Sequence, residues 1–422
     1  MIYFLSLLLL LTLPFQFAIP FPWVGDVPLA RIIAATIIGL FLIRALFRRS
    51  FRLPEPVFVG LIGSFLFLSL ASVFWASRYD LAIPKIVFFL NLFPLVFVWH
   101  DLSERHPEKL RSLCFVTAIG AAGAAIIAIA FFVAQFFFGV STTYHFVLDR
   151  AFPFFLGHDF SVLVREYPSL LVNLGGETVL RATALFPDPH VAAYFFGLSG
   201  FLALGLSRVC GRPVYLWLAA ILFLADLLTF SRGGLVGLLA GSAVSIIIIA
   251  SGSSWPIKIQ LRTAILGGTM LLVFLSPPVL NRFLTSFSFT DTSSTERIML
   301  WKEAVGIIKE NPGLGLGLGN YLSTVRPLYD PEAPFYAHSL YLDIAAEIGL
   351  LGLSLLFGVF FWIGRRVALT RRSDLLAAPL AGAVTLYLAH SFVETPIYSI
   401  HVTIVLVLYF VLALSLGRRP AW

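Results

Sequence analysis

Apolar runs of roughly 20 residues, separated by short charged segments, dominate this sequence. Hydrophobic residues make up 59% of the 422 and charged residues only 12%, and the mean hydropathy is +0.94. Runs of this length match the ~30 Å hydrocarbon core of a bilayer. Strict alternation of apolar and polar residues is absent, which argues against a transmembrane β-barrel. The sequence therefore predicts an all-α polytopic membrane protein.

About twelve of these runs are long enough to be predicted as transmembrane helices. The first run has no basic residue before Arg31, so we interpret it as a membrane helix and not as a signal peptide. The predicted spans are residues 2–20, 28–46, 56–75, 82–99, 113–138, 189–207, 214–230, 233–250, 262–280, 338–363, 375–392 and 396–416.

The distribution of Lys and Arg predicts how these spans are oriented. If the N-terminus is cytoplasmic, the cytoplasmic segments include RRSFR, HDLSERHPEKLR, RVCGR, PIKIQLR, GRRVALTRRSD and GRRPAW, which hold more than half of the 29 Lys and Arg. The short loops on the opposite side, PWVGDVP, ASRYD and VETPI, carry a single one. The positive-inside rule then places both termini in the cytoplasm.

The net charge of +7 and the two cysteines add little to this assignment. Basic loops are expected in any inner-membrane protein, so the charge does not indicate an acidic partner, and we expect no nucleic acid to bind. Cys114 and Cys210 both fall at predicted cytoplasmic loop edges, where a disulfide is not expected.

Two of the predicted outer segments are much longer than the others. Residues 139–188 join spans five and six, and residues 281–337 join spans nine and ten as a partly helical periplasmic loop. Loops of this length with structure of their own are usually functional. No repeat or separate soluble domain is evident, so residues 1–422 are predicted to form one transmembrane domain.

The stretch LTFSRGGLVGLLAG places Arg232 between apolar runs. In the predicted topology Arg232 lies at the outer mouth between spans seven and eight. Ser231 can cap the following helix, and Gly233 and Gly234 permit close approach of a neighbouring backbone. Arg232 either snorkels to the interface or binds an anion there.

The second long segment contains a predicted amphipathic helix that carries Arg297. Ser293 and Glu296 fit a capping box, and apolar residues follow at helical spacing until Asn311 and Pro312 end the helix. A cation in the first turn opposes the helix dipole. Arg297 therefore serves either an anionic ligand or a structural carboxylate.

Four glycines at alternate positions follow in the stretch NPGLGLGLGNY. A dinucleotide fingerprint needs a preceding strand, and here a helix precedes, so we reject a nucleotide site. The pattern is compatible with a flexible turn whose amides face an anion.

Polar residues gather again where the long loop meets span ten. His338 stands at this boundary, and a neutral imidazole there is suited to act as a general base. Tyr336 and Tyr341 suit the membrane interface and are candidate substrate contacts. Glu347 lies deeper and must have a partner, so it forms either a helix-packing ion pair or part of the substrate site.

The first long segment ends in RATALFPDPH, which places Arg181 next to the membrane on the outer side. Arg181 either snorkels or binds substrate. Asp188 and His190 are only a weak metal signal, and the sequence has no HExxH, CxxC or dense carboxylate cluster. We predict neither a metal nor another cofactor.

Three motifs, taken in order, resemble the O-antigen ligase and polymerase superfamily. They are SRGG after an apolar span, ERIMLW…NPGLGLGLGNY, and AHSLYLDIAAEIGLLG. RATALFPDPH resembles the family's segment before the sixth span. The family more often has Asn-Pro-Asn there, so Asp188 and His190 depart from its pattern.

The resemblance implies a glycosyltransferase on the periplasmic face of the bacterial inner membrane. Such enzymes move a glycan from undecaprenyl pyrophosphate to an acceptor hydroxyl, which in a ligase belongs to the lipid A–core sugar. Arg232 and Arg297 match the family's arginines, and His338 matches its histidine. The resemblance thus assigns pyrophosphate binding to the arginines and the role of base to His338, with inversion in a single displacement.

Three other functions remain compatible with the sequence. A polymerase would use a second lipid-linked repeat unit as acceptor, and a protein O-oligosaccharyltransferase would use a protein. A transporter of an anionic or lipid-linked substrate would also suit about twelve spans. The polar residues gather at the outer mouth and not near the midplane, which favours chemistry at the membrane surface.

Overall fold

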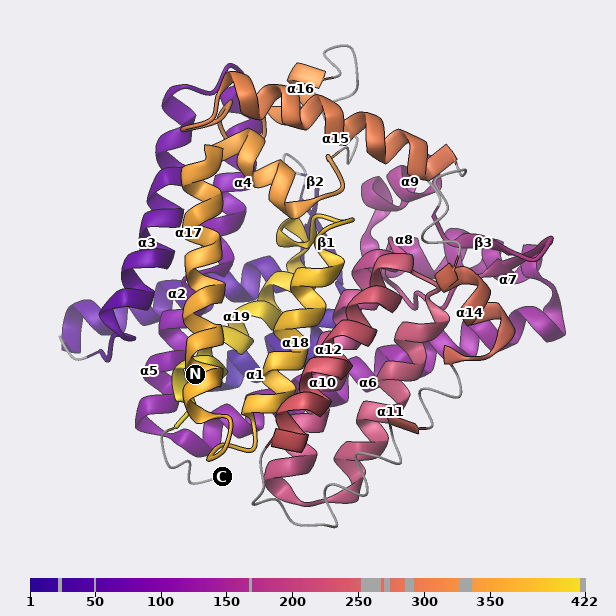
Figure 1. Cartoon of the computed structure of the whole chain (residues 1–422), viewed down its shortest axis with the longest axis horizontal. Coiled ribbons are helices and arrows are strands. Elements are labelled where there is room, and N and C mark those ends of the chain that lie inside the picture. Colours follow the sequence, from indigo (N-terminus) through magenta and orange to yellow (C-terminus); the bar gives the residue numbers. More distant parts are fainter. Residues whose placement is uncertain are drawn as a thin grey trace.

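The computed structural model describes residues 1–21, 25–48, 51–166, 169–251, 267–268, 274–284, 292–325 and 336–417. Over these residues the chain is a bundle of helices with two small antiparallel hairpins, β1–β2 and β3–β4 (Figure 1). The prediction of an all-α polytopic membrane protein is confirmed at this level.

The first part of the chain forms helices that correspond to the first five predicted spans. In order, its elements are α1 (Ile2–Thr12), η1 (Leu13–Phe15), β1 (Ala18–Phe21), β2 (Gly25–Pro28), α2 (Leu29–Arg48), α3 (Pro56–Ala71), η2 (Ser72–Phe74), α4 (Tyr79–Leu92), α5 (Leu95–Arg105) and α6 (Pro107–Phe138).

The first long segment and the next three spans follow. They comprise α7 (Val140–Phe146), the π-helical turn η3 (Val147–Ala151), α8 (Phe152–Leu156), α9 (His158–Glu166), β3 (Leu171–Leu174), β4 (Glu177–Leu180), α10 (Pro189–Cys210), α11 (Pro213–Leu228) and α12 (Arg232–Ser251).

The remaining described elements are those of the second long segment and the C-terminal helices. They are α14 (Pro277–Leu284), α15 (Thr292–Glu310), α16 (Tyr321–Val325), α17 (Leu340–Thr370), α18 (Ala377–His390), η5 (Pro396–Tyr398) and α19 (Ile400–Ser415).

Fewer described helices are long enough to cross a membrane than the sequence predicts. Seven described helices are long and apolar enough to cross a membrane, whereas Ile2–Phe15, Pro213–Leu228, Ala377–His390 and Ile400–Ser415 are shorter apolar helices. A helix of the length of α19 rises about 24 Å, less than the ~30 Å hydrocarbon core. Most of the predicted ninth span, 262–280, lies outside the described residues. The count of twelve is therefore not confirmed.

Small residues bring the central helices together. A Cβ at Gly241 of α12 would lie 2.4 Å from the carbonyl oxygen of Gly382 in α18, and a Cβ at Gly237 would lie 2.9 Å from that of Leu386. Such close backbone approach is the usual way in which membrane helices associate. It fixes the ends of α12 and α18, where the candidate site lies.

The second long segment lies across one end of the bundle, with α15 running over the start of α17 (Figure 1). The predicted helix and its end at Asn311 are confirmed. The glycine turn that follows packs against a kink of α17 at Ile348 and Gly349, where Leu316 and Gly317 donate backbone hydrogen bonds of 2.9 and 2.8 Å to α17 carbonyls. The expectation that these amides face an anion is wrong, because the kink uses them.

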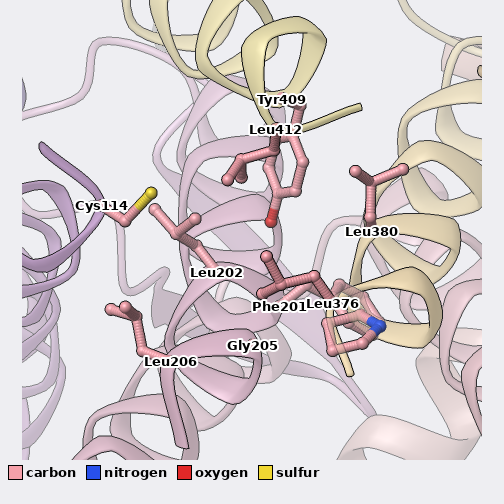
Figure 2. A pocket seen from close by; sticks show the side chains of 10 residues that line it. Cys114, Phe201, Leu202, Gly205, Leu206, Leu376, Leu380, Tyr409 and Leu412 are labelled. Carbon is pink, nitrogen blue, oxygen red and sulfur yellow. The ribbon is translucent and has the colours of Figure 1, made fainter. Parts of the chain in front are cut away.

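An apolar hollow lies elsewhere, between α6, α10, α18 and α19 (Figure 2). Cys114, Leu202, Leu206, Leu380 and Leu412 are among its lining residues. Leu206 is about 24 Å along α10 from His190 by the helical rise. The hollow is therefore separate from the polar cluster described next.

Candidate active site

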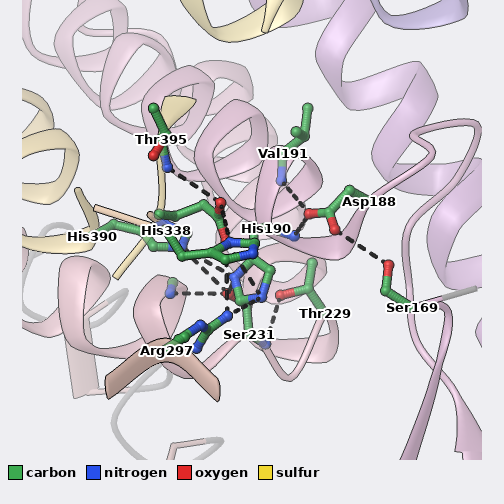
Figure 3. A network of polar contacts seen from close by, with 12 residues as sticks. Ser169, Asp188, His190, Val191, Thr229, Ser231, Arg297, His338, His390 and Thr395 are labelled. Carbon is green, nitrogen blue, oxygen red and sulfur yellow. Dashed lines mark hydrogen bonds and ion pairs between the residues drawn. The ribbon is translucent and has the colours of Figure 1, made fainter. Parts of the chain in front are cut away.

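Ionisable side chains from five segments meet at the end of the bundle that α15 covers (Figure 3). These segments are the start of α10, the turn between α11 and α12, α15, the residues before α17, and the connection between α18 and α19. Phe230 and His338, on two of them, each have a φ of 50°. Non-glycine residues in this region cost free energy and cluster at functional sites.

The SRGG stretch forms the tight turn that the sequence predicts. The Ser231 hydroxyl accepts a hydrogen bond of 3.1 Å from the Gly234 amide and caps α12, whose first residue is Arg232. A Cβ at Gly233 would lie 2.2 Å from the ring of His390, and one at Gly234 would lie 2.8 Å from the Cβ of Ala193. Only glycine at these positions lets the turn pack against α10 and α18.

His338 is paired with a carboxylate that the sequence analysis missed. Its Nδ1 lies 3.1 Å from Oε1 of Glu394, in the connection between α18 and α19. Burial lowers the pKa of His338, but the charge and the hydrogen bond of Glu394 outweigh this effect, so that the net pKa lies above its usual 6.5. Burial also raises the pKa of Glu394, but His338, His190 and Arg297 together bring it well below its usual range. Glu394 therefore orients His338 and makes it more basic.

The second carboxylate oxygen of Glu394 faces Arg297 and His190. Nη2 of Arg297 lies 3.8 Å from Oε2, and Nε2 of His190 lies 3.9 Å from it. Arg297 and His190 are themselves 3.4 Å apart. Glu394 thus contacts the imidazole of His338 through one carboxylate oxygen and the arginine of α15 through the other.

His190 is also bound to the turn that carries Arg232. Its Nδ1 lies 2.8 Å from the hydroxyl of Ser231 and 3.4 Å from Nε2 of His390. Asp188 accepts hydrogen bonds of 2.6 and 3.2 Å from the His190 and Val191 amides and so caps α10. The two positions that depart from the family pattern therefore have defined places: one is a helix cap and the other belongs to the cluster.

Arg181 lies beside this cluster and is buried. Its guanidinium donates to the carbonyl oxygens of Thr229 at 2.6 Å and Ser169 at 3.2 Å, so it ties the first long segment to the end of α11. The pKa of Arg181 is lowered to about 9, chiefly by burial, with the charges of Arg282, Arg297 and Arg232 acting in the same direction and that of Asp188 against it. Three other arginines thus lie within electrostatic range of Arg181 at this end of the bundle.

Two other predicted substrate contacts, Glu347 and Tyr336, lie in a second cluster. Glu347 pairs with Lys85 at 2.7 Å and accepts a 2.9 Å hydrogen bond from Tyr398, on which Tyr336 stacks. Of the two possibilities for Glu347, the geometry shows the helix-packing ion pair. The Tyr341 hydroxyl donates to the Leu388 carbonyl at 2.6 Å. A role in substrate binding for Tyr336, Tyr341 and Glu347 stays a prediction, as it does for Arg181.

No group of three or more His, Cys, Asp or Glu within the described ranges is arranged to hold a metal ion. The polar cluster offers cations and imidazoles instead. Such a set suits an anionic group held next to a proton acceptor.

A multi-pass helical bundle with arginines and a His–carboxylate pair at one end suits a membrane protein that binds an anionic group. Comparison with known families agrees with this class. The family model described as O-antigen ligase matches residues 217–357, which include Arg232, Arg297 and His338. The resemblance to the O-antigen ligase superfamily is thereby confirmed over residues 217–357, and the chain is a multi-pass membrane protein.

A curated relative supports the same class more distantly. The chain is 29% identical over 217 residues to a probable peptidoglycan glycosyltransferase FtsW from Coxiella burnetii. The alignment covers 45% of this chain and 57% of that protein, so the chain spans little more than half the length of this relative.

Proposed function

We propose that this protein is an O-antigen ligase-type glycosyltransferase. It moves a glycan from undecaprenyl pyrophosphate to a hydroxyl of a lipid A–core sugar, on the periplasmic face of the inner membrane. The arginine cluster beside the His338–Glu394 pair carries this proposal, because the reaction needs both cations for a pyrophosphate and a base for a hydroxyl.

The arginines bind the leaving group. When the bond between the anomeric carbon and the phosphate oxygen breaks, the pyrophosphate gains negative charge. Arg232 and Arg297 meet this charge with bidentate, charge-assisted hydrogen bonds, and they are preorganised by the α12 cap and by contacts with His190 and Glu394. Arg282 donates to the Phe230 carbonyl at 3.3 Å and adds positive charge beside the turn.

His338 accepts the proton of the acceptor hydroxyl as that oxygen attacks the anomeric carbon. Glu394 holds Nδ1, so the other ring nitrogen, Nε2, is the proton acceptor. One bond to the anomeric carbon forms as the other breaks, so a single displacement inverts the configuration. The chemistry uses no metal.

The acceptor is tested by reconstitution. The purified protein in liposomes receives undecaprenyl-pyrophosphate glycan together with either lipid A–core or a second lipid-linked repeat unit. A ligase transfers to lipid A–core, whereas a polymerase extends the lipid-linked glycan instead. Uptake of the donor without transfer to either acceptor would favour a transporter and overturn the proposal.

The periplasmic position of the site has its own test. A reporter fused after Trp422 should be active in the cytoplasm, and one inserted at Asp330 should be active outside. The reverse pattern would place the site on the wrong face for this reaction.

A further inference from the structure

One buried carboxylate binds the residue next to His338 and the residue next to Glu394. Asp343, in the first turn of α17, accepts a 2.8 Å hydrogen bond from the amide of Ala337, the residue just before His338. Its second oxygen accepts a hydrogen bond from the hydroxyl of Thr395, the residue just after Glu394. Asp343 is 1% exposed, so both contacts are shielded from water.

The surrounding backbone shows what this link holds in place. His338 and Glu394 are 56 residues apart in the sequence, and His338 has a φ of 50°. The Leu340 amide donates to the carbonyls of Ser391 at 3.0 Å and Glu394 at 3.1 Å, which joins the same two segments. Backbone bonds hold the two segments together, and Asp343 fixes the residue beside each functional side chain.

A second carboxylate, one turn further along α17, binds the same connection between α18 and α19. Glu347 binds the Tyr398 hydroxyl as Asp343 binds that of Thr395, and residues four apart share one face of a helix. Glu347 forms an ion pair with Lys85, 2.7 Å away, whereas Asp343 accepts hydrogen bonds from an amide and a hydroxyl. These hydrogen bonds hold the two neighbouring segments in place.

We propose that Asp343 is a positioning residue that holds His338 and Glu394 in register, so that Glu394 can orient the imidazole for proton transfer. The proposal rests on the proposed function for its kinetic test. Asp343 does not touch the reacting atoms, and it acts through Ala337 and Thr395.

The groups that set the titration of His338 come from several elements. They are Glu394 between α18 and α19, Arg297 on α15 and Asp343 on α17, while His190 on α10 acts on Glu394. A displaced Glu394 would weaken the effect that keeps His338 basic, whereas Arg297 keeps a second contact, 3.4 Å from His190. Asp343 substitutions should therefore alter proton transfer more than donor binding.

The test compares Asp343→Ala and Asp343→Asn with Ser354→Ala, a control on the exposed face of the same helix. Asparagine can still accept from the Ala337 amide and can donate to the Thr395 hydroxyl, but it lacks the negative charge. We expect turnover to fall about 10- to 100-fold in Asp343→Ala and no more than about 3-fold in Asp343→Asn, as a share of the ~10²–10⁴-fold that a general base contributes. Donor affinity should stay within about 3-fold of native in all three.

A second measurement is independent of any substrate. NMR titration of labelled His338 in detergent should show a lower pKa in Asp343→Ala than in the native protein, with Asp343→Asn between the two, because asparagine keeps the hydrogen bonds but lacks the charge that itself raises the pKa of His338. This result would stand even if reconstitution showed that the proposed function is wrong. The inference is overturned if Asp343→Ala leaves both turnover and the titration unchanged. It is also overturned if Asp343→Asn is as impaired as Asp343→Ala, because the charge at the start of α17 would then be what matters.

Discussion

The cluster around Glu347 and the cluster around Glu394 differ in how their charges are balanced. In the cluster of Lys85, Glu347 and Tyr398, one cation meets one anion at 2.7 Å, and the Lys85 ammonium lies 4.2 Å from the Tyr398 ring centre. In the other cluster, Arg232, Arg282 and Arg297 lie within electrostatic range of Arg181, and Arg297 is 3.8 Å from Glu394.

The difference separates a structural contact from a site. A short, buried pair such as Lys85–Glu347 balances its own charge, and breaking it leaves a buried ion. Arginines that repel one another at a membrane surface are costly unless an anion joins them. The first cluster holds α4 against α17, whereas the second is the one to which the proposed function assigns the pyrophosphate.

The largest effect is expected from the arginines of the site. Arg232→Ala and Arg297→Ala should each abolish measurable transfer while the protein still folds and inserts, since loss of one preorganised donor typically costs about 10²–10³-fold and weaker donor binding adds to it. Arg→Lys should also be poor, because an ammonium cannot form the bidentate contact. Transfer is measured in liposomes. Native activity in either alanine variant would reduce that arginine to a structural role.

The next effect concerns the base. His338→Gln keeps hydrogen bonding but not basicity, and single-turnover transfer should slow by roughly 10²–10⁴-fold while donor binding persists. If donor binding disappears with transfer, His338 belongs to the pyrophosphate site. If the variant transfers at the native rate, another group takes the proton.

A smaller effect, a shift in the pH profile, follows from the partner of the base. His338 must be neutral to accept a proton, and Glu394 raises its pKa, so the native rate should rise with pH and level off only above the ordinary pKa of 6.5. In Glu394→Gln the main effects that oppose burial are removed, so the pKa of His338 falls and the rising limb should move to lower pH. If the rising limb of the rate profile lay at the same pH in both proteins, Glu394 would not set the pKa of His338.

The smallest effect on transfer is expected at the other cluster. Lys85→Met combined with Glu347→Gln removes both charges, and we expect transfer within about 3-fold of native. Lys85→Met alone should destabilise the protein by about 3–5 kcal/mol, because it leaves the Glu347 carboxylate buried and unpaired. Thermal unfolding in detergent measures this. A large loss of transfer in the stable double variant would show instead that Glu347 binds substrate.

Much of the architecture and part of the site follow from the sequence alone. Apolar runs located the helices, and the order of the SRGG and AHSLYL stretches indicated Arg232 and His338. Glu394 was missed because the loop VETPI is a turn signal with no helical period around it. Its pairing with His338 depends on how α17 meets the α18–α19 connection, and periodicity carries no information on contacts 56 residues apart.

The glycine turn shows the opposite case, a sequence pattern that indicated a binding site where the structure has a packing contact. Alternating glycines resembled a backbone anion site, but Gly315, Gly317 and Gly319 have positive φ because the turn fits between α17 and other backbone. A Cβ at Gly319 would lie 2.5 Å from the Leu81 carbonyl oxygen. The pattern arises from close packing, which a sequence cannot distinguish from ligand binding.

The central claim, that the arginine cluster binds a lipid pyrophosphate, is tested most directly by binding alone. Calorimetry in detergent would compare the affinity of undecaprenyl pyrophosphate for the native protein, Arg297→Ala and the control Arg78→Ala, whose arginine is exposed and paired with Asp80. We expect native and control affinities to agree, and Arg297→Ala to bind at least about 10-fold more weakly, the loss of a charge-assisted contact worth ~1.5–3 kcal/mol. Equal affinities in all three proteins would contradict the account.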